Sequence, residues 1–233
     1  STLMNCLLKN NRSLATEVAG TTQEPVVGSG KWKNFNLHLV DTAGITKNQK
    51  IKISLWKSCD LAWAVIDASL PITKQLLQIV NLGEKNNKPL IIIINKCDLV
   101  KSRTELEEEL MKRLNSMNFW PVVYLSALKK VNISSLMKIV EEMVKNSQKV
   151  LSKRKIEETV KKMVEKNPPN FWNNGKLKIY YAKQEPGLIQ NFIFFINDNK
   201  WLHFSYQRYI NNYLRKKLDL KYLPIKTIFK KSI

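Results

Sequence analysis

Short apolar runs that alternate with amphipathic stretches are the feature of this sequence that most limits its possible folds. The runs have the length of strands; most are apolar on both faces, whereas 36–40 alternates polar and apolar residues, and the stretches between the runs have helical spacing. The predicted strands lie at 36–40, 61–66, 90–94 and 122–125, and the predicted helices at 3–8, 73–86, 104–117 and 133–146. Strands of this kind belong to a parallel sheet with helices on both faces. We therefore predict an α/β domain with a mostly parallel sheet over residues 1–148.

The pattern changes near residue 150, which predicts a second domain over residues 149–233. A basic amphipathic helix is predicted over 149–166, and it ends before Pro168-Pro169 because proline cannot continue a helix. The later elements are predicted strands at 176–182 and 191–196, a helix at 205–218 and a strand at 225–229. This α-β-β-α-β order predicts a small α+β domain. Its aromatic residues recur at strand and helix spacings, which predicts core packing rather than stacking on bases. They are Tyr180, Tyr181, Phe192, Phe194, Phe195, Tyr206 and Tyr209.

The chain is strongly basic, with 39 Lys and Arg residues against 19 Asp and Glu, a formal net charge of +20. Such a charge favours a polyanionic partner, either nucleic acid or an anionic membrane surface. An AT-rich genome would also enrich the chain in Lys, Asn and Ile, so part of the charge is expected to reflect codon usage. No run approaches the 18 apolar residues of a transmembrane helix. The three cysteines form no CxxC pair, which argues against a disulfide framework or a zinc site.

Four short motifs follow strands or extended segments in one order along the chain. They are Gly20-Thr21-Thr22, Asp41-Thr42-Ala43-Gly44, Asn95-Lys96-Cys97-Asp98 and Ser126-Ala127-Leu128. Open α/β sheets bind their ligands at the carboxyl ends of strands, where these motifs are predicted to lie. A carboxylate at Asp98 can accept hydrogen bonds from both N1–H and the 2-amino group of guanine. Adenine offers neither donor, so this motif predicts selection of guanine.

The other motifs fit the rest of a guanine nucleotide. A backbone amide of 126–128 can contact guanine O6. Asp41 can hold a water on Mg²⁺, and a hydroxyl of Thr21 or Thr22 can ligate the ion directly. The amide of Gly44 can meet a γ-phosphate. Each motif alone is weakly specific, but all four in this order predict a GTPase domain.

With these motifs, the chain resembles the EngA/Der family of GTPases over essentially all 233 residues. Behind the GTPase motifs, Ser205-Tyr206-Gln207-Arg208-Tyr209-Ile210 and Leu223-Pro224-Ile225 are what point to this family among GTPases. The resemblance implies the family's second GTPase domain, of the P-loop type, followed by a KH-like domain without the GxxG loop of nucleic-acid-binding KH domains. It also implies hydrolysis of GTP to GDP and phosphate in the assembly of the large ribosomal subunit.

The resemblance further implies roles for individual residues. Those implied to contact GTP or GDP are Ser1, Thr2, Thr21, Thr22, Asp41, Gly44, Asn95, Lys96, Asp98, Ser126, Ala127 and Leu128. The implied Mg²⁺ ligands are Ser1, Thr22 and Asp41, with Thr21 as the alternative to Thr22. Thr22, Gly44 and Ile45 are the residues implied in catalysis. Ile45 occupies the place of the water-orienting Gln of Ras-like enzymes, which implies a K⁺ ion beside the phosphates instead.

The sequence begins at the position of the Ser in GxxxxGK[ST], without the first strand and the phosphate-cradling loop. We therefore expect a fragment of a longer protein, and we expect GTP affinity to collapse without that loop. A non-catalytic remnant that binds rRNA and the ribosome is the alternative. The expected partners are rRNA and the large ribosomal subunit, bound by a monomer without a membrane span. The expected location is the cytoplasm of a bacterium or endosymbiont, or an organelle matrix if a targeting segment was lost upstream.

Overall fold

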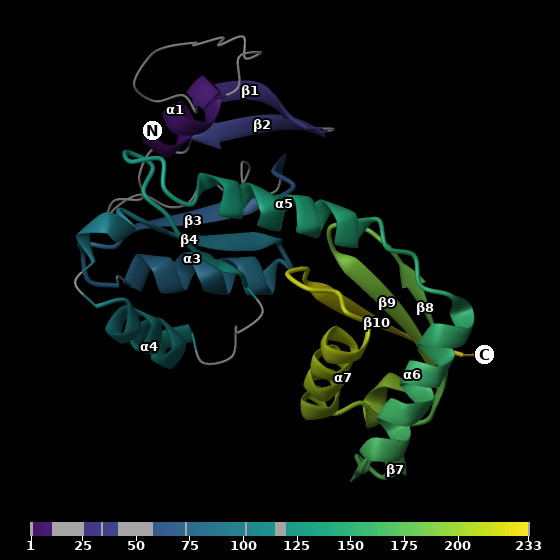
Figure 1. Ribbon diagram of the computed structural model, residues 1–233. Helices are drawn as coiled ribbons and strands as arrows, with labels where there is room; N and C mark the ends of the chain where they lie inside the picture. Colours follow the sequence, from purple (N-terminus) through teal and green to yellow (C-terminus); the bar gives the residue numbers. More distant parts are fainter. Residues whose placement is uncertain are drawn as a thin grey trace. The chain divides into compact units, whose positions relative to one another are not determined.

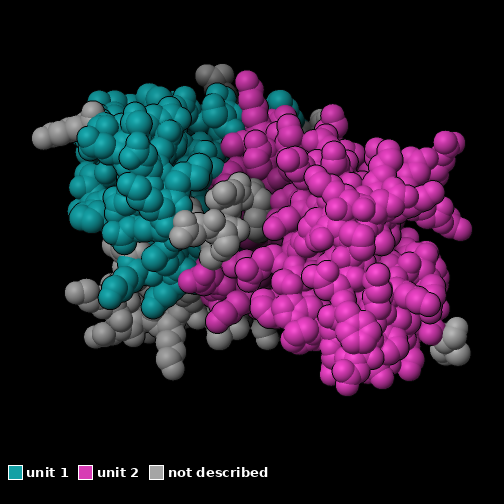
Figure 2. Space-filling model, turned by 90° about the horizontal axis from the view of Figure 1, so that it is seen from below, with its two compact units in different colours: residues 1–80, 91–118, 122–137 teal, residues 81–90, 119–121, 138–233 magenta. Residues whose placement is uncertain are grey.

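The computed structural model describes residues 2–10, 26–33, 35–41, 58–72, 74–100, 102–114 and 120–232. The chain divides into two compact units (Figure 2). One unit comprises residues 1–80, 91–118 and 122–137, and the other comprises residues 81–90, 119–121 and 138–233. The first contains most of the predicted nucleotide motifs, and the second contains the whole of the predicted α-β-β-α-β segment.

A three-stranded sheet in the order β3-β4-β5 forms the centre of the predicted α/β domain (Figure 1). Its strands are β3 (Ala62–Asp67), β4 (Leu90–Asn95) and β5 (Val122–Tyr124). β4 and β5 run parallel, with Ile92 opposite Val122 and Ile94 opposite Tyr124. Residues 90–94 of β4 are all buried, as a strand covered on both faces requires. The prediction of an α/β fold with a parallel sheet is confirmed.

The helices of this part bury apolar stripes, as their spacing predicts. They are α3 (Lys74–Lys85), α4 (Arg103–Leu114) and α5 (Ile133–Ser147), with a short 3₁₀ helix η1 (Cys97–Leu99) after β4. Val80 of α3 and Leu136 and Met137 of α5 are fully buried. Ser102 precedes α4, and its hydroxyl accepts the Glu105 N–H at 3.4 Å, which satisfies one free donor of the first turn.

An antiparallel hairpin of β1 (Val26–Trp32) and β2 (Phe35–Asp41) forms a separate two-stranded sheet beside helix α1 (Thr2–Asn10). The sequence predicts β2 but not β1, because Gly28 and Gly30 interrupt the apolar alternation. Gly28 permits the contact between helix and strand. A Cβ at this position would lie 2.7 Å from a methyl group of Leu8 and 3.0 Å from the Met4 side chain.

The second unit contains a sheet of three strands, in the order β10-β9-β8, with two helices on one face (Figure 1). The strands are β8 (Ile179–Glu185), β9 (Gln190–Ile196) and β10 (Ile225–Lys231), and the helices are α6 (Lys153–Lys166) and α7 (Phe204–Lys217). β9 pairs antiparallel with β8 and parallel with β10. Phe192 and Phe194 of β9 are fully buried with Met163 of α6 and Ile210 of α7.

Helix α6 begins four residues later than the sequence predicts. The Ser152 hydroxyl accepts the Lys155 N–H at 3.2 Å and caps the helix. Gln184 holds the preceding segment, because its side chain accepts the Leu151 N–H at 2.8 Å and donates to the Lys149 carbonyl at 2.9 Å. Residues 149–152 are therefore anchored to the sheet in an extended path instead of continuing the helix.

A short hairpin of β6 (Phe171–Trp172) and β7 (Gly175–Lys176) follows α6, and the sequence does not predict it as a separate element. Asn173 and Asn174 at its turn have φ angles of 50° and 59°. Two positive φ angles are what a type I′ hairpin turn requires. Gly175 lies against the Trp201 ring of η2 (Asn199–Trp201), and a Cβ there would overlap the indole.

Candidate nucleotide-binding site

The loops that follow β4 and β5 lie against each other and bring two of the predicted motifs together. The Leu125 N–H donates to the Ile94 carbonyl at 2.9 Å, and the Cys97 N–H donates to the Leu125 carbonyl at 3.1 Å. These bonds continue the parallel pairing beyond the ends of both strands. Residues 95–98 therefore lie beside residues 125–128 at the carboxyl edge of the sheet, where α/β folds bind ligands.

Asn95 ties the two loops together through its side chain. Its Oδ1 accepts the N–H of Ala127 at 3.0 Å, and its backbone carbonyl accepts the N–H of Ala68 at 2.9 Å. Ala127 is buried, so its amide depends on this side-chain oxygen as an acceptor. The first residue of the Asn95–Asp98 motif thus fixes the position of the loop that follows β5.

We expect Asn95→Ala to lower the free energy of unfolding by about 1–3 kcal/mol, because it leaves the Ala127 N–H without its acceptor. Urea denaturation followed by circular dichroism measures this change. Asn36→Ala, which alters an exposed Asn of β2, is the matched control and should change stability by about 0.5 kcal/mol or less. Equal losses in the two variants would contradict the role assigned to Asn95.

Lys96 forms an ion pair that the sequence does not predict. Its backbone adopts the left-handed conformation with φ of 60°, and its Nζ lies 2.6 Å from Oδ2 of Asp67 at the end of β3. The hydrogen bond from Lys96, with those from the Ser69 hydroxyl and N–H, lowers the pKa of Asp67 from 3.8 to about 2. In the sequence, Asp67 directly follows the apolar run 61–66, and this position was the available signal that it lies at the same edge of the sheet as residues 95–98.

The ion pair of Asp67 with Lys96 predicts how the stability of the folded chain changes at acid pH. Asp67 has a lower pKa in the folded chain than in the unfolded chain, so its stabilising contribution is complete above about pH 4. That contribution is lost as the pH falls from about 4 to about 2. We expect Lys96→Met to move the pKa of Asp67 back toward 3.8, as measured by NMR titration of the carboxyl carbon. An unchanged titration of Asp67 in this variant would exclude Lys96 as the main cause.

Asp98 is held as a carboxylate by the neighbouring loop. Hydrogen bonds from Ser126 and Lys129 lower its pKa, with the Ser126 hydroxyl as the largest cause. The Lys129 Nζ lies 3.0 Å from Oδ2 of Asp98, and the Asp98 side chain is only 18% exposed. Ser126 is buried, and its hydroxyl oxygen also accepts the Lys129 N–H at 3.3 Å. The carboxylate is therefore ionised at neutral pH and oriented by two partners.

The loop that carries Ser126 and Ala127 turns back on itself. Ser126 and Val131 exchange backbone hydrogen bonds of 3.1 and 3.0 Å, which close the turn. Leu128 lies at its tip with 79% of its surface exposed. This arrangement gives a short, fixed loop with an apolar tip and a buried hydroxyl beside the Asp98 carboxylate.

The other predicted site residues lie elsewhere or outside the described part of the chain. Thr2 begins α1 and is exposed, and Asp41 ends β2, where it is half-buried and pairs with Val26. Residues outside the described ranges are Ser1, Thr21, Thr22, Gly44 and Ile45. The structure thus brings together the six predicted residues of the guanine-contacting loops, and it places Thr2 and Asp41 on other elements.

The predicted Mg²⁺ ligands can be tested only at Asp41. Its carboxylate is a hard oxygen donor at the carboxyl end of a strand, which fits a Mg²⁺ ion held through water. Among the described residues, no group of three or more His, Cys, Asp or Glu side chains is arranged to hold a metal ion. In the same residues, no helix is both long enough and apolar enough to span a bilayer.

Comparisons with known proteins match both parts of the chain. Residues 1–96 match the profile of the 50S ribosome-binding GTPases, and residues 150–230 match that of the C-terminal KH-domain-like region of EngA bacterial GTPase enzymes. The chain is 31% identical over 245 residues to GTPase Der of Mycoplasma capricolum, which covers 99% of this chain and 56% of that protein. It is 32% identical over 246 residues to GTPase Der of Mesoplasma florum, with 99% and 56% covered.

The chain thus spans about half the length of the curated relatives that it matches. A solved structure also shares the fold of part of the chain. This structure is a bacterial selenocysteine-specific elongation factor EF-Sec, with a TM-score of 0.51 and 21% identity. The similarity covers 65% of this chain and 27% of the elongation factor.

Proposed function

Because the chain belongs to the EngA/Der family of GTPases, we propose that it is the guanine-nucleotide-binding and RNA-binding part of an enzyme that hydrolyses GTP to GDP and phosphate. The observation that carries this proposal is the ionised Asp98 carboxylate, which is oriented by Ser126 and Lys129 beside the loop after β5. In this proposal residues 1–148 bind the nucleotide and residues 149–233 bind RNA.

The proposed selection of guanine follows from the chemistry of this edge of the sheet. The Asp98 carboxylate accepts hydrogen bonds from N1–H and the 2-amino group, while a backbone amide of 126–128 donates to O6. Asn95 sets the distance between the two loops through its bond to the Ala127 N–H. An adenine base would leave the ionised carboxylate without donors, which is the strongest form of discrimination available to a polar site.

The proposed hydrolysis is direct attack of water on the γ-phosphate. Mg²⁺, when bound, neutralises charge on the phosphate oxygens. Ser1, Thr22 and Asp41 would hold the ion, with Thr21 as the alternative to Thr22, and Thr2 would lie beside the phosphates. Gly44 would contact the γ-phosphate through its amide. Ile45 cannot orient a water molecule by hydrogen bonding, so another group must stabilise the charge that develops in the transition state.

We propose that a K⁺ ion supplies that charge. The expected result is a GTP hydrolysis rate at least about tenfold higher in K⁺ than in Na⁺ at equal ionic strength, because a missing electrostatic contact of this kind costs two or more orders of magnitude in rate. The measurement is phosphate release by a protein that carries these 233 residues behind a phosphate loop. Equal rates in the two salts would exclude K⁺.

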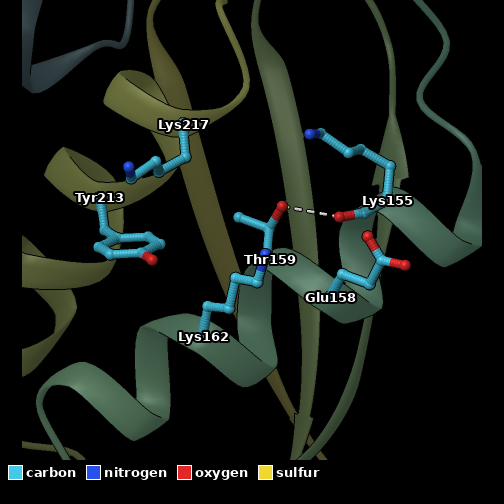
Figure 3. A pocket seen from close by; sticks show the side chains of 6 residues that line it. All are labelled: Lys155, Glu158, Thr159, Lys162, Tyr213 and Lys217. Atoms are coloured by element: carbon cyan, nitrogen blue, oxygen red, sulfur yellow. Dashed lines mark hydrogen bonds between the residues drawn. The ribbon is translucent and has the colours of Figure 1, made fainter.

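The proposed partners are rRNA and the large ribosomal subunit, bound by a monomer in the bacterial cytoplasm. A groove of about 250 Å³ between α6 and α7 supports an RNA partner (Figure 3). Three exposed lysines line it, Lys155, Lys162 and Lys217, together with Tyr213, Thr159 and one carboxylate, Glu158. In the described part of the chain these lysines make no ion pair, which leaves their charges for phosphates.

Three basic residues at the start of α6 and just before it are paired with carboxylates of the chain. The Lys153 Nζ lies 3.7 Å from Oε1 of Glu157, and the Arg154 Nε lies 2.8 Å from Oε1 of Glu158. The Lys149 Nζ lies 3.6 Å from Oδ2 of Asp219. These acidic partners reduce the attraction of a polyanion at those positions. The groove between α6 and α7 therefore offers three lysines without an ion pair among the described residues, and its one carboxylate, Glu158, is paired with Arg154.

A further inference from the structure

Two aromatic side chains that were predicted to lie in the core are instead found at the surface. Tyr180 and Tyr181 are 57% and 45% exposed, so the core prediction is wrong for both. A bulge between Ile179 and Tyr181 disturbs the pairing of β8 with β9 and changes the phase of the strand alternation. Ala182 then faces the helices, and Tyr181 faces the opposite side of the sheet.

Tyr181 stacks on Phe195 on the face of the sheet that α6 and α7 do not cover. Their ring centroids lie 4.3 Å apart, and the ring planes differ by 13°. Tyr181, Phe195 and Lys230 are consecutive partners across the three strands, so they form one row of this face. An exposed, preformed stack of two rings beside a lysine is the arrangement on which unpaired bases stack in RNA-binding sheets.

The charges around this row are mainly positive. Lys183 lies on the same face, two residues further along β8, and Lys226 lies on the same face of β10, four residues from Lys230. Among the described residues on this face between Tyr181 and Glu185 and opposite them, the one acidic side chain is Glu185, whose Oε1 lies 3.7 Å from the Lys183 Nζ. Lys226 and Lys230 make no ion pair in the part of the chain that the structure describes. Their charges complement the phosphate groups of a strand that runs along β10 past the stacked base.

We propose that this sheet face binds single-stranded RNA, with an unpaired base stacked on the Tyr181–Phe195 pair and the adjoining phosphates at Lys230 and Lys226. This inference rests on the proposed RNA partner and specifies the form of RNA that is bound. Paired bases in a duplex are already stacked on their neighbours and cannot reach the rings. The site is distinct from the groove between α6 and α7, which contacts phosphates of either form.

Fluorescence anisotropy on the 233-residue chain tests the proposal with fluorescein-labelled single-stranded RNA of about ten nucleotides and a duplex of the same length. We expect Tyr181→Leu to weaken single-strand binding about tenfold, Tyr181→Phe to retain it, and duplex binding to be unchanged. Lys230→Gln should lower the slope of log affinity against log salt concentration by about one, because one phosphate contact is lost. Tyr180→Leu is the matched control, because both tyrosines line the groove between α6 and β8, but among the described residues Tyr181 and not Tyr180 forms a ring stack.

Three results would overturn the proposal. Single-strand binding could be unaffected by Tyr181→Leu, Tyr180→Leu could weaken it equally, or the duplex could lose as much affinity as the single strand. Retention by Tyr181→Phe, with an unchanged circular dichroism spectrum, excludes misfolding as the cause of a loss. If the wild-type chain binds neither RNA, the proposed RNA partner fails together with this site. The proposed nucleotide selection is measured separately and would stand.

Discussion

Replacement of Asp98 by Asn is expected to weaken GDP binding by at least about 100-fold, since two hydrogen bonds to an ionised acceptor are each worth about 1.5–3 kcal/mol. The Asn side chain keeps the shape of Asp98 but presents an NH₂ group to the N1–H of guanine. Xanthine carries an oxygen where guanine has the 2-amino group, so the same variant should bind xanthosine diphosphate more tightly than the wild type does.

Calorimetric titration of both nucleotides into a protein that carries these 233 residues behind a phosphate loop measures this exchange of preference. Asp60→Asn is the matched control, because Asp60 is exposed and precedes β3 at the opposite end of the strand from the site. It should leave both affinities unchanged. If the Asp98→Asn variant still binds GDP more tightly than xanthosine diphosphate, then Asp98 does not select guanine. An ATPase would then become possible again.

The second large effect is expected in the core of the α+β segment. Phe194 is fully buried and stacks on Phe229 with ring centroids 5.4 Å apart. Phe194→Ala should lower the free energy of unfolding by about 3–5 kcal/mol, because it removes a buried ring and leaves a cavity. Urea denaturation followed by far-ultraviolet circular dichroism measures the loss.

Phe195 provides a matched control one residue away in the same strand. It lies on the opposite face, is half-buried and stacks on Tyr181. Phe195→Ala should therefore cost only about 1 kcal/mol, the worth of the aromatic pair. Similar losses in the two variants would contradict the assignment of the two faces, and with it the open sheet face proposed for RNA.

The central sheet was predictable because its strands are read from continuous apolar runs. The residues 90–94 are apolar at every position, and only a strand covered on both faces accommodates that pattern. The strand β1 was not predictable in this way. Gly28 is required there by the close approach of Leu8 and Met4, which is a tertiary contact, and it breaks the local pattern.

The candidate site was predictable in its residues but not in its bonds. The order of the motifs places Asn95, Asp98 and Ser126 at strand ends, and the structure brings them together there. The Lys96–Asp67 ion pair and the Asn95–Ala127 bond depend on which strands are neighbours in the sheet, and one sequence does not give strand order. Exposure of Tyr181 depends on the bulge in β8, which also has no local signature.

The affinity ratio of GDP to ADP is the measurement that tests the account most directly. Both nucleotides carry the same phosphates and ribose, so their difference isolates the contacts made to the base by residues 95–98 and 126–128. In a protein that carries these 233 residues behind a phosphate loop, calorimetric titration should show GDP bound about 10⁴-fold more tightly than ADP. ADP binding within tenfold of GDP would contradict guanine selection by the ionised Asp98.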